Sequence, residues 1–130
     1  MLKRILFAVG IIVLFSSCEV WEEFYDILNA VDMEVENTSY AFSITDIVVM
    51  NTSDLSYVQV YDKKTNQYGF HTVSPGGTGS FSLSGLSLYT TYRITVFDSW
   101  NDSWYFDVTH NNISEISIKY DGYNVTYNAF

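Results

Sequence analysis

From Val31 onwards, apolar and polar side chains alternate with a period of two, and this alternation limits the fold more than any other feature. Successive side chains of a β-strand point to opposite faces, so the pattern predicts half-buried strands. Candidate strands span Val31–Glu36, Phe42–Met50, Ser56–Tyr61, Gln67–Val73, Ser80–Leu83, Thr91–Asp98, Trp104–His110, Ile113–Tyr120 and Tyr123–Tyr127. Many short strands separated by turn residues predict an all-β fold, a sandwich or a barrel.

The last two candidate strands are joined by Asp121-Gly122. This dipeptide favours a hairpin with a two-residue type I′ turn. Such a turn would pair Tyr120 with Tyr123, and the next same-face pairs would be Ile118 with Val125 and Ile116 with Tyr127. We expect these six side chains to share one face.

The first 18 residues have the features of an export signal. Lys3 and Arg4 precede the apolar run Ile5–Phe15, and Ser16-Ser17 leads into Cys18, the only cysteine of the chain. A membrane-spanning helix needs about 20 apolar residues, so this run is too short to be one. A positive start, a short apolar core and small residues are typical of a cleaved secretory signal.

This stretch resembles the lipobox of bacterial lipoproteins. Cys18 matches the cysteine that the family acylates, Ser16 and Ser17 match the small positions before it, and Phe15 stands where Leu, Val or Ile is usual. The resemblance implies fatty acylation of Cys18 and an outer-membrane lipoprotein of the bacterial cell envelope, facing the periplasm or the cell surface. The acidic residues after Cys18 also resemble the surface-export tags of Bacteroidota lipoproteins. An ordinary signal peptide with an unrelated cysteine is the alternative.

Three parts follow from this interpretation: a signal peptide (1–17), a lipidated tether (18–30) and a β-sandwich domain (31–130). Within the tether, Glu19–Ala30 is the only helix candidate, because apolar residues recur at the helical spacing. The resulting stripe consists of Trp21, Phe24, Tyr25 and Leu28. It either packs on the domain or lies against the membrane.

The chain is acidic, with a formal net charge of −9 for 130 residues. Removal of residues 1–17 would leave 113 residues and, because Lys3 and Arg4 would be lost, a charge of −11. Such a surface is repelled by phosphate backbones, so we expect no nucleic-acid partner.

The segment from Ser80 to Val96 resembles the corner between strands E and F of fibronectin type III domains. Leu86, Thr90 and Tyr92 match the family pattern, with Leu88 in place of its proline. The segment 57–73 is similar to the family's C–C′ hairpin. The resemblance implies a single antiparallel immunoglobulin-like sandwich of about seven to nine strands, in which the Tyr92 hydroxyl bonds back to the loop. Another antiparallel sandwich, such as a transthyretin-like one, is the alternative.

The most unusual segment is Asp98-Ser99-Trp100-Asn101-Asp102-Ser103-Trp104. Trp104 is in phase with Phe106 and Val108, which predicts that it points into the core. At the tip, Trp100 is a candidate for stacking on a sugar ring, and the hydroxyls of that sugar would be bonded by the neighbouring polar side chains Asp98, Asn101 and Asp102. The alternative is a plain turn whose Trp folds onto its neighbours. The same oxygens are candidate calcium ligands, but the segment lacks an EF-hand loop, and we expect no metal.

No catalytic pattern stands out. His71 and His110 are isolated in the sequence, and no Ser lies in a nucleophile-elbow motif. We therefore expect no cofactor and no enzymatic activity, with a small hydrolase as a less favoured reading. The sequence predicts a membrane-anchored binding or assembly module whose partner is a glycan or another envelope protein. A structural surface antigen without a specific ligand is the alternative.

Overall fold

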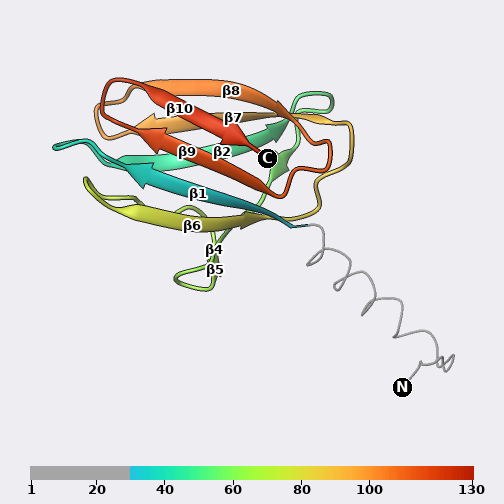
Figure 1. Cartoon of the computed structure of the whole chain (residues 1–130), viewed down its shortest axis with the longest axis horizontal. Coiled ribbons are helices and arrows are strands. Elements are labelled where there is room, and N and C mark those ends of the chain that lie inside the picture. The colour runs from blue at the N-terminus through green and yellow to red at the C-terminus, as the bar shows by residue number, and fades with distance from the viewer. Residues whose placement is uncertain (1–29) are drawn as a thin grey trace, which may run out of the picture.

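The computed structural model describes residues 30–130, which form two packed β-sheets without any helix (Figure 1). The ten strands are β1 (Val31–Asn37), β2 (Ile44–Asn51), β3 (Tyr57–Val58), β4 (Val60–Asp62), β5 (Gln67–Tyr68), β6 (Thr78–Leu83), β7 (Thr91–Asp98), β8 (Ser103–Thr109), β9 (Glu115–Tyr120) and β10 (Val125–Ala129). One sheet has the order β10-β9-β1-β6-β4-β5 and the other the order β3-β2-β7-β8.

The alternation in the sequence places every second side chain of each long strand between the sheets. In β1, Val31, Met33 and Val35 are buried, and the residues between them face outwards. The same alternation in β7 buries Tyr92, Ile94 and Val96. The predicted all-β fold with one apolar core is thus confirmed. Burial of these side chains is the main favourable term in folding, at roughly 25 cal/mol per Å² of apolar area.

The six-stranded sheet is mixed, so the prediction of a purely antiparallel sandwich is wrong. β1 pairs with β6 in the antiparallel sense but with β9 in the parallel sense, with Met33 opposite Ile116. No hairpin constrains the parallel pair, because seven strands lie between β1 and β9 in the chain. Parallel neighbours need such a long connection, whereas a tight turn always produces antiparallel ones. The strand count of ten also exceeds the seven to nine expected.

Two predicted strands are interrupted in the structure. The run 56–61 is divided at Gln59, because β3 pairs with β2 of one sheet while β4 pairs with β6 of the other. The run 67–73 keeps only β5 and an isolated bridge between Val73 and Ile44. It is interrupted by Gly69, which has a φ of 111°, a left-handed conformation that favours glycine.

The final hairpin has a four-residue loop, and its predicted register is wrong by two residues. Tyr120 pairs with Val125 rather than with Tyr123. The carboxylate of Asp121 accepts hydrogen bonds from the backbone N–H groups of Tyr123 (2.8 Å) and Asn124 (2.7 Å), which stabilises the longer loop. Because the shift is an even number of residues, Val125 and Tyr127 stay on the predicted face.

The predicted back bond of Tyr92 is present. Its hydroxyl oxygen accepts a 2.8 Å hydrogen bond from the backbone N–H of Ser87, in the loop that precedes β7. This contact fixes the loop against the strand that follows it.

The chain enters the domain at one end of the sandwich and turns at the other. Val31 begins β1 at the first end. Phe130 also lies at this end, since the backbone of Phe130 forms hydrogen bonds with Ser114 and Glu115. Asn37 ends β1 at the second end (Figure 1). We call these the entry end and the loop end. In residues 30–130, no helix is long and apolar enough to cross a membrane.

Candidate functional site

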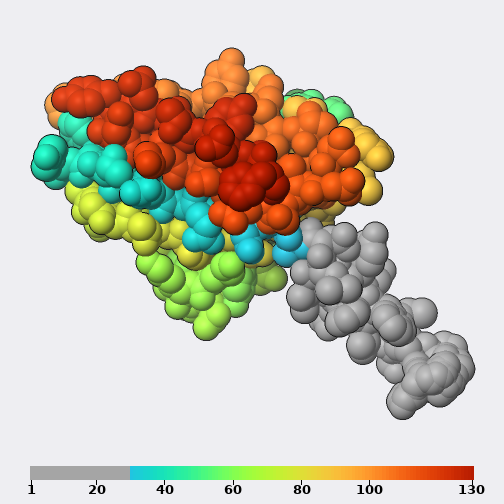
Figure 2. Space-filling model, in the orientation of Figure 1, coloured from blue at the N-terminus to red at the C-terminus, as the bar shows by residue number. Residues whose placement is uncertain are grey.

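Exposed aromatic side chains gather at the loop end of the sandwich. Tyr40 lies in the loop between β1 and β2, Trp100 between β7 and β8, and Tyr123 between β9 and β10; their exposed fractions are 102%, 68% and 81%. Phe42 lies between them and is half-buried. We call these four residues the aromatic loop end. Figure 2 shows the loops that carry Tyr40 and Tyr123, in cyan and red, next to each other at one end of the molecule.

The loops of the aromatic loop end are in contact. The rings of Phe42 and Trp100 are 5.6 Å apart between centroids, at an interplanar angle of 52°. Gly122 approaches the first loop closely, since a methyl group at this position would lie 3.1 Å from Cβ of Ser39 and 3.5 Å from the ring of Phe42. Three loops that are distant in the sequence therefore form one continuous surface.

Asp98 holds the loop that carries Trp100. It is only 3% exposed, and its Oδ1 accepts hydrogen bonds from the backbone N–H groups of Trp100 (3.1 Å) and Asp102 (2.8 Å). Its Oδ2 accepts the hydroxyl of Tyr120 at 2.5 Å. Asn101, at the tip, has a φ of 66°, which short polar residues adopt more readily than most. The side chain of Asp98 thus determines the path of this turn.

Asn37 and Ser39 hold the loop that carries Tyr40. The amide of Asn37 donates to the carbonyl oxygens of Phe42 (2.8 Å) and Val73 (3.0 Å). Its Oδ1 accepts hydrogen bonds from the backbone N–H and the hydroxyl of Ser39, at 3.0 and 2.7 Å. Both residues are buried, so the polar groups that shape this loop lie beneath it, while the ring of Tyr40 projects into solvent.

The predicted ligand-binding residues occupy different environments. Trp100, Asn101 and Asp102 are exposed at the tip, whereas the carboxylate of Asp98 is buried and bonded within the protein. Their role in sugar binding stays a prediction. Trp104 packs against the core with its ring 5.5 Å from that of Tyr120, as its phase predicts.

Tyr40, Phe42 and Tyr123 were not predicted as parts of a site. The sequence contains only a weak sign of this site, which is the presence of single aromatic residues in the turn sequences Thr38-Ser39-Tyr40 and Gly122-Tyr123-Asn124. A large aromatic side chain inside a turn has no core to enter, which makes it a candidate for contact with a partner.

A second polar site lies beside β4, where a cavity of about 510 Å³ is lined by Asp62, Lys64, His71 and the 74–79 loop. Nδ1 of His71 lies 2.7 Å from Oδ2 of Asp62. Burial would raise the pKa of Asp62, but the N–H groups of Lys64 and Thr65 together with His71 outweigh burial, so this pKa lies below its ordinary value. This pair ties the β4–β5 hairpin to the segment that precedes Val73.

Metal ligation has no support in the part of the chain that the structure describes. Among residues 30–130, no three His, Cys, Asp or Glu side chains are grouped so that they could hold an ion.

Comparisons with protein-family models, with curated proteins and with solved structures found no match for this chain.

Proposed function

We propose that this protein is a lipid-anchored, non-catalytic binding module of the bacterial cell envelope, and that it binds its partner through the aromatic loop end. The observation that carries this proposal is that Tyr40, Trp100 and Tyr123 are exposed on three fixed loops. Buried side chains of Asn37 and Asp98 hold the first two loops, and the exposed carboxylate of Asp121 holds the third. Trp and Tyr contribute much of the energy at protein interfaces. A loop that is already fixed loses little conformational entropy when it binds.

The lipid anchor is part of the proposal. Cys18, the preceding signal peptide and the helix predicted for Glu19–Ala30 lie outside the described residues, except for Ala30 itself, which is not helical. The path of β1 supports an anchored display. Its seven residues, at about 3.3 Å each, separate the entry end from the loop end by about 20 Å. A lipid on the entry side would leave the aromatic loop end directed away from the outer membrane, on either of its faces.

We assign the domain to the immunoglobulin-like sandwiches. The bond between Tyr92 and Ser87 and the two packed sheets support this assignment. The parallel pairing of β1 with β9 is its main departure from a simple antiparallel arrangement.

An envelope protein is the partner that the surface favours. The aromatic loop end is made of projecting loops, and these loops are rich in Tyr, Trp, Ser and Asn. This composition is typical of antibody loops that recognise protein surfaces, because rigid aromatic rings supply contact area and small polar residues supply adaptable hydrogen bonds.

A glycan is the second candidate. Its support is local: the ring of Trp100 is 68% exposed, and the exposed polar residues Asn101 and Asp102 follow it. An aromatic face beside a few polar groups is a common construction for small-ligand sites.

One variant set tests the binding function. The loop variant carries Tyr40→Ser, Trp100→Ala and Tyr123→Ser, and the control carries Tyr57→Ser, Tyr68→Ser and Tyr89→Ser, which remove exposed tyrosines from elsewhere. Full-length proteins are used for capture from envelope extract and on a glycan array. We expect the wild type and the control to capture the same protein, and the loop variant to lose at least tenfold of it.

Equal capture by the loop variant would overturn the proposal, and a sugar signal lost with Trp100→Ala alone would favour the glycan. Absence of any partner for the wild type would favour a structural surface antigen.

A separate experiment tests the lipid anchor. Palmitate labelling should disappear in Cys18→Ser, and labelling equal to the wild type would exclude Cys18 as the lipid site.

A further inference from the structure

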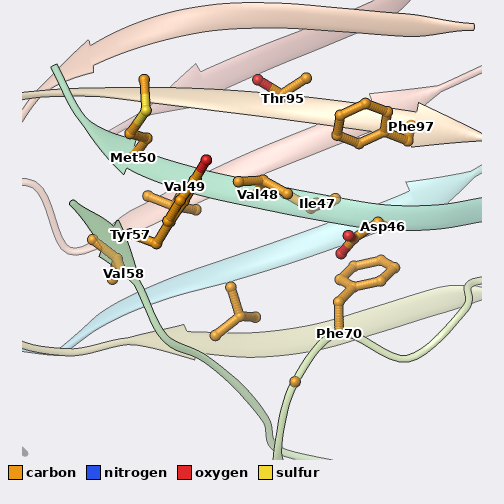
Figure 3. Close-up of a pocket in the computed structure, with 12 residues that line it drawn as sticks. Asp46, Ile47, Val48, Val49, Met50, Tyr57, Val58, Phe70, Thr95 and Phe97 are labelled. Carbon is orange, nitrogen blue, oxygen red and sulfur yellow. The ribbon is translucent and has the colours of Figure 1, made fainter. Parts of the chain in front are cut away.

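An apolar groove of about 520 Å³ lies along β2 and β3 of the four-stranded sheet (Figure 3). In Figure 3, β2 runs across the centre, Tyr57 and Val58 of β3 lie on one side, and the ring of Phe70 lies below. Its main apolar lining residues are Val48, Met50, Val58, Val60, Phe70 and Phe97.

The groove exists because this edge of β2 is only partly covered. β3 covers Val49 and Met50, and the bridge from Val73 covers Ile44. Between them, residues 45–48 have no neighbouring strand on this side within the described chain. The cause is the crossing of the chain at Gln59 to the other sheet, which ends β3 after two residues.

Backbone groups are therefore open on this edge. The N–H of Asn51 bonds to Ser56, so Asn51 faces the β3 side. The N–H and C=O groups of successive residues in a strand point to opposite neighbours. Because Ile47 is four residues before Asn51, its N–H and C=O groups also point towards the β3 side. Folded proteins normally cover such an edge with a loop or a helix, since open edges promote association.

We propose that residues 19–29 of this same chain dock into the groove through the stripe Trp21, Phe24, Tyr25 and Leu28. This segment lies outside the described residues, and the described chain begins directly after it, at Ala30. Val31 is opposite Leu83, and Leu83 is opposite Val60, so the three form one row across β1, β6 and β4. Val60 is a wall of the groove.

The distances match without any linker. Two strand spacings of about 4.8 Å separate Val31 from Val60, or about 10 Å in total. The three residues from Leu28 to Val31 span up to about 10 Å when extended. Leu28 thus reaches the groove.

The chemistry also matches. The groove is mainly apolar, and the stripe offers three aromatic rings and a leucine from one face of the segment. The acidic residues Glu19, Glu22 and Glu23 lie off the stripe and would stay in solvent, as on an amphipathic surface element. The lining of the groove includes none of the four residues of the aromatic loop end, so docking here does not depend on the function proposed for that end.

Photo-crosslinking of the full-length protein in detergent tests this docking. Benzoylphenylalanine replaces Phe24, and crosslinked peptides are identified by mass spectrometry after mixing with an equal amount of isotope-labelled protein. We expect links within one molecule to the peptides that contain residues 46–50, 57–60 or 69–70. Val58→Lys should lower their yield at least fivefold, whereas Thr126→Lys, on the exposed face of β10, should leave it unchanged.

A second measurement leaves the domain itself unaltered. Trp21→Ser with Leu28→Ser should speed hydrogen exchange of the Ile47 amide at least tenfold if the segment covers this edge. Crosslinks to detergent alone would show that the segment lies against the membrane, and mixed-isotope links would show exchange with a second copy. Either result, or unchanged exchange at Ile47, would overturn the docking.

Discussion

The hydroxyl of Tyr120 donates a 2.5 Å hydrogen bond to Oδ2 of Asp98, and this bond joins the two sheets at the loop end. Tyr120 ends β9 of the six-stranded sheet, and Asp98 ends β7 of the four-stranded sheet. Both side chains are buried. Burial, followed by the carboxylate of Asp98, raises the pKa of Tyr120 well above its ordinary value, so the phenol keeps its proton and remains a donor.

Tyr120→Phe should lower the free energy of unfolding by about 1–3 kcal/mol, because it leaves a buried carboxylate oxygen without its partner. Urea denaturation at pH 7 measures the change, with Tyr57→Phe, an exposed position, as the control. A loss no larger than that of the control would show that the bond between the sheets contributes nothing to stability.

Asp62→Asn should make the free energy of unfolding less dependent on pH in the acidic range. The folded pKa of Asp62 lies below its ordinary value, so the stabilisation from its charged form is present above about pH 4 and is lost as the pH falls through the folded pKa. The free energy of unfolding, measured from pH 7 to pH 2, should be lower for the variant at pH 7 and should then fall less steeply. The exposed Asp46→Asn provides the control. Parallel curves for wild type and Asp62→Asn would contradict this expectation.

Gly79→Ala should destabilise the core by about 1–3 kcal/mol through overpacking. A methyl group at this position would lie 2.6 Å from Cε2 of Phe81 and 3.1 Å from Cγ2 of Val73. The ring of Phe81 has little freedom to move, because it is stacked on Phe70 at 4.7 Å. Thermal unfolding compared with Ser82→Ala, a substitution on the opposite face of β6, measures the effect. A melting temperature equal to that of the control would mean that the core adjusts freely.

The two tryptophans of the near-repeat should differ in their effect on stability. Trp104→Ala removes a ring that packs against the core and should cost about 3 kcal/mol. Trp100→Ala removes a largely exposed ring and should change the free energy of unfolding by less than about 1 kcal/mol. Denaturation of both variants tests this difference. Equal losses would mean that Trp100 is a structural residue, and its place in the proposed binding surface would fail.

Local signals predicted much of the secondary structure. The alternation in β1, β7 and β9 identified which side chains enter the core, because side-chain direction in a strand depends only on residue parity. The back bond of Tyr92 was predicted from the resemblance of this segment to fibronectin type III domains, and it joins residues five apart. The predicted register of the hairpin at Asp121 was wrong, because the side chain of Asp121 stabilises a longer loop than the Asp-Gly dipeptide alone suggests.

The sequence by itself determined that this chain forms short strands with one buried face, because that information is carried by neighbouring residues. Only the tertiary structure decided which strands pair, as in the parallel contact of β1 with β9 and the division of one expected strand between two sheets at Gln59. It also decided that Tyr40, Trp100 and Tyr123 share one end, whereas the sequence pattern indicated only the tip with Trp100. These relationships join residues tens of positions apart, and they depend on how the two sheets pack rather than on any local pattern.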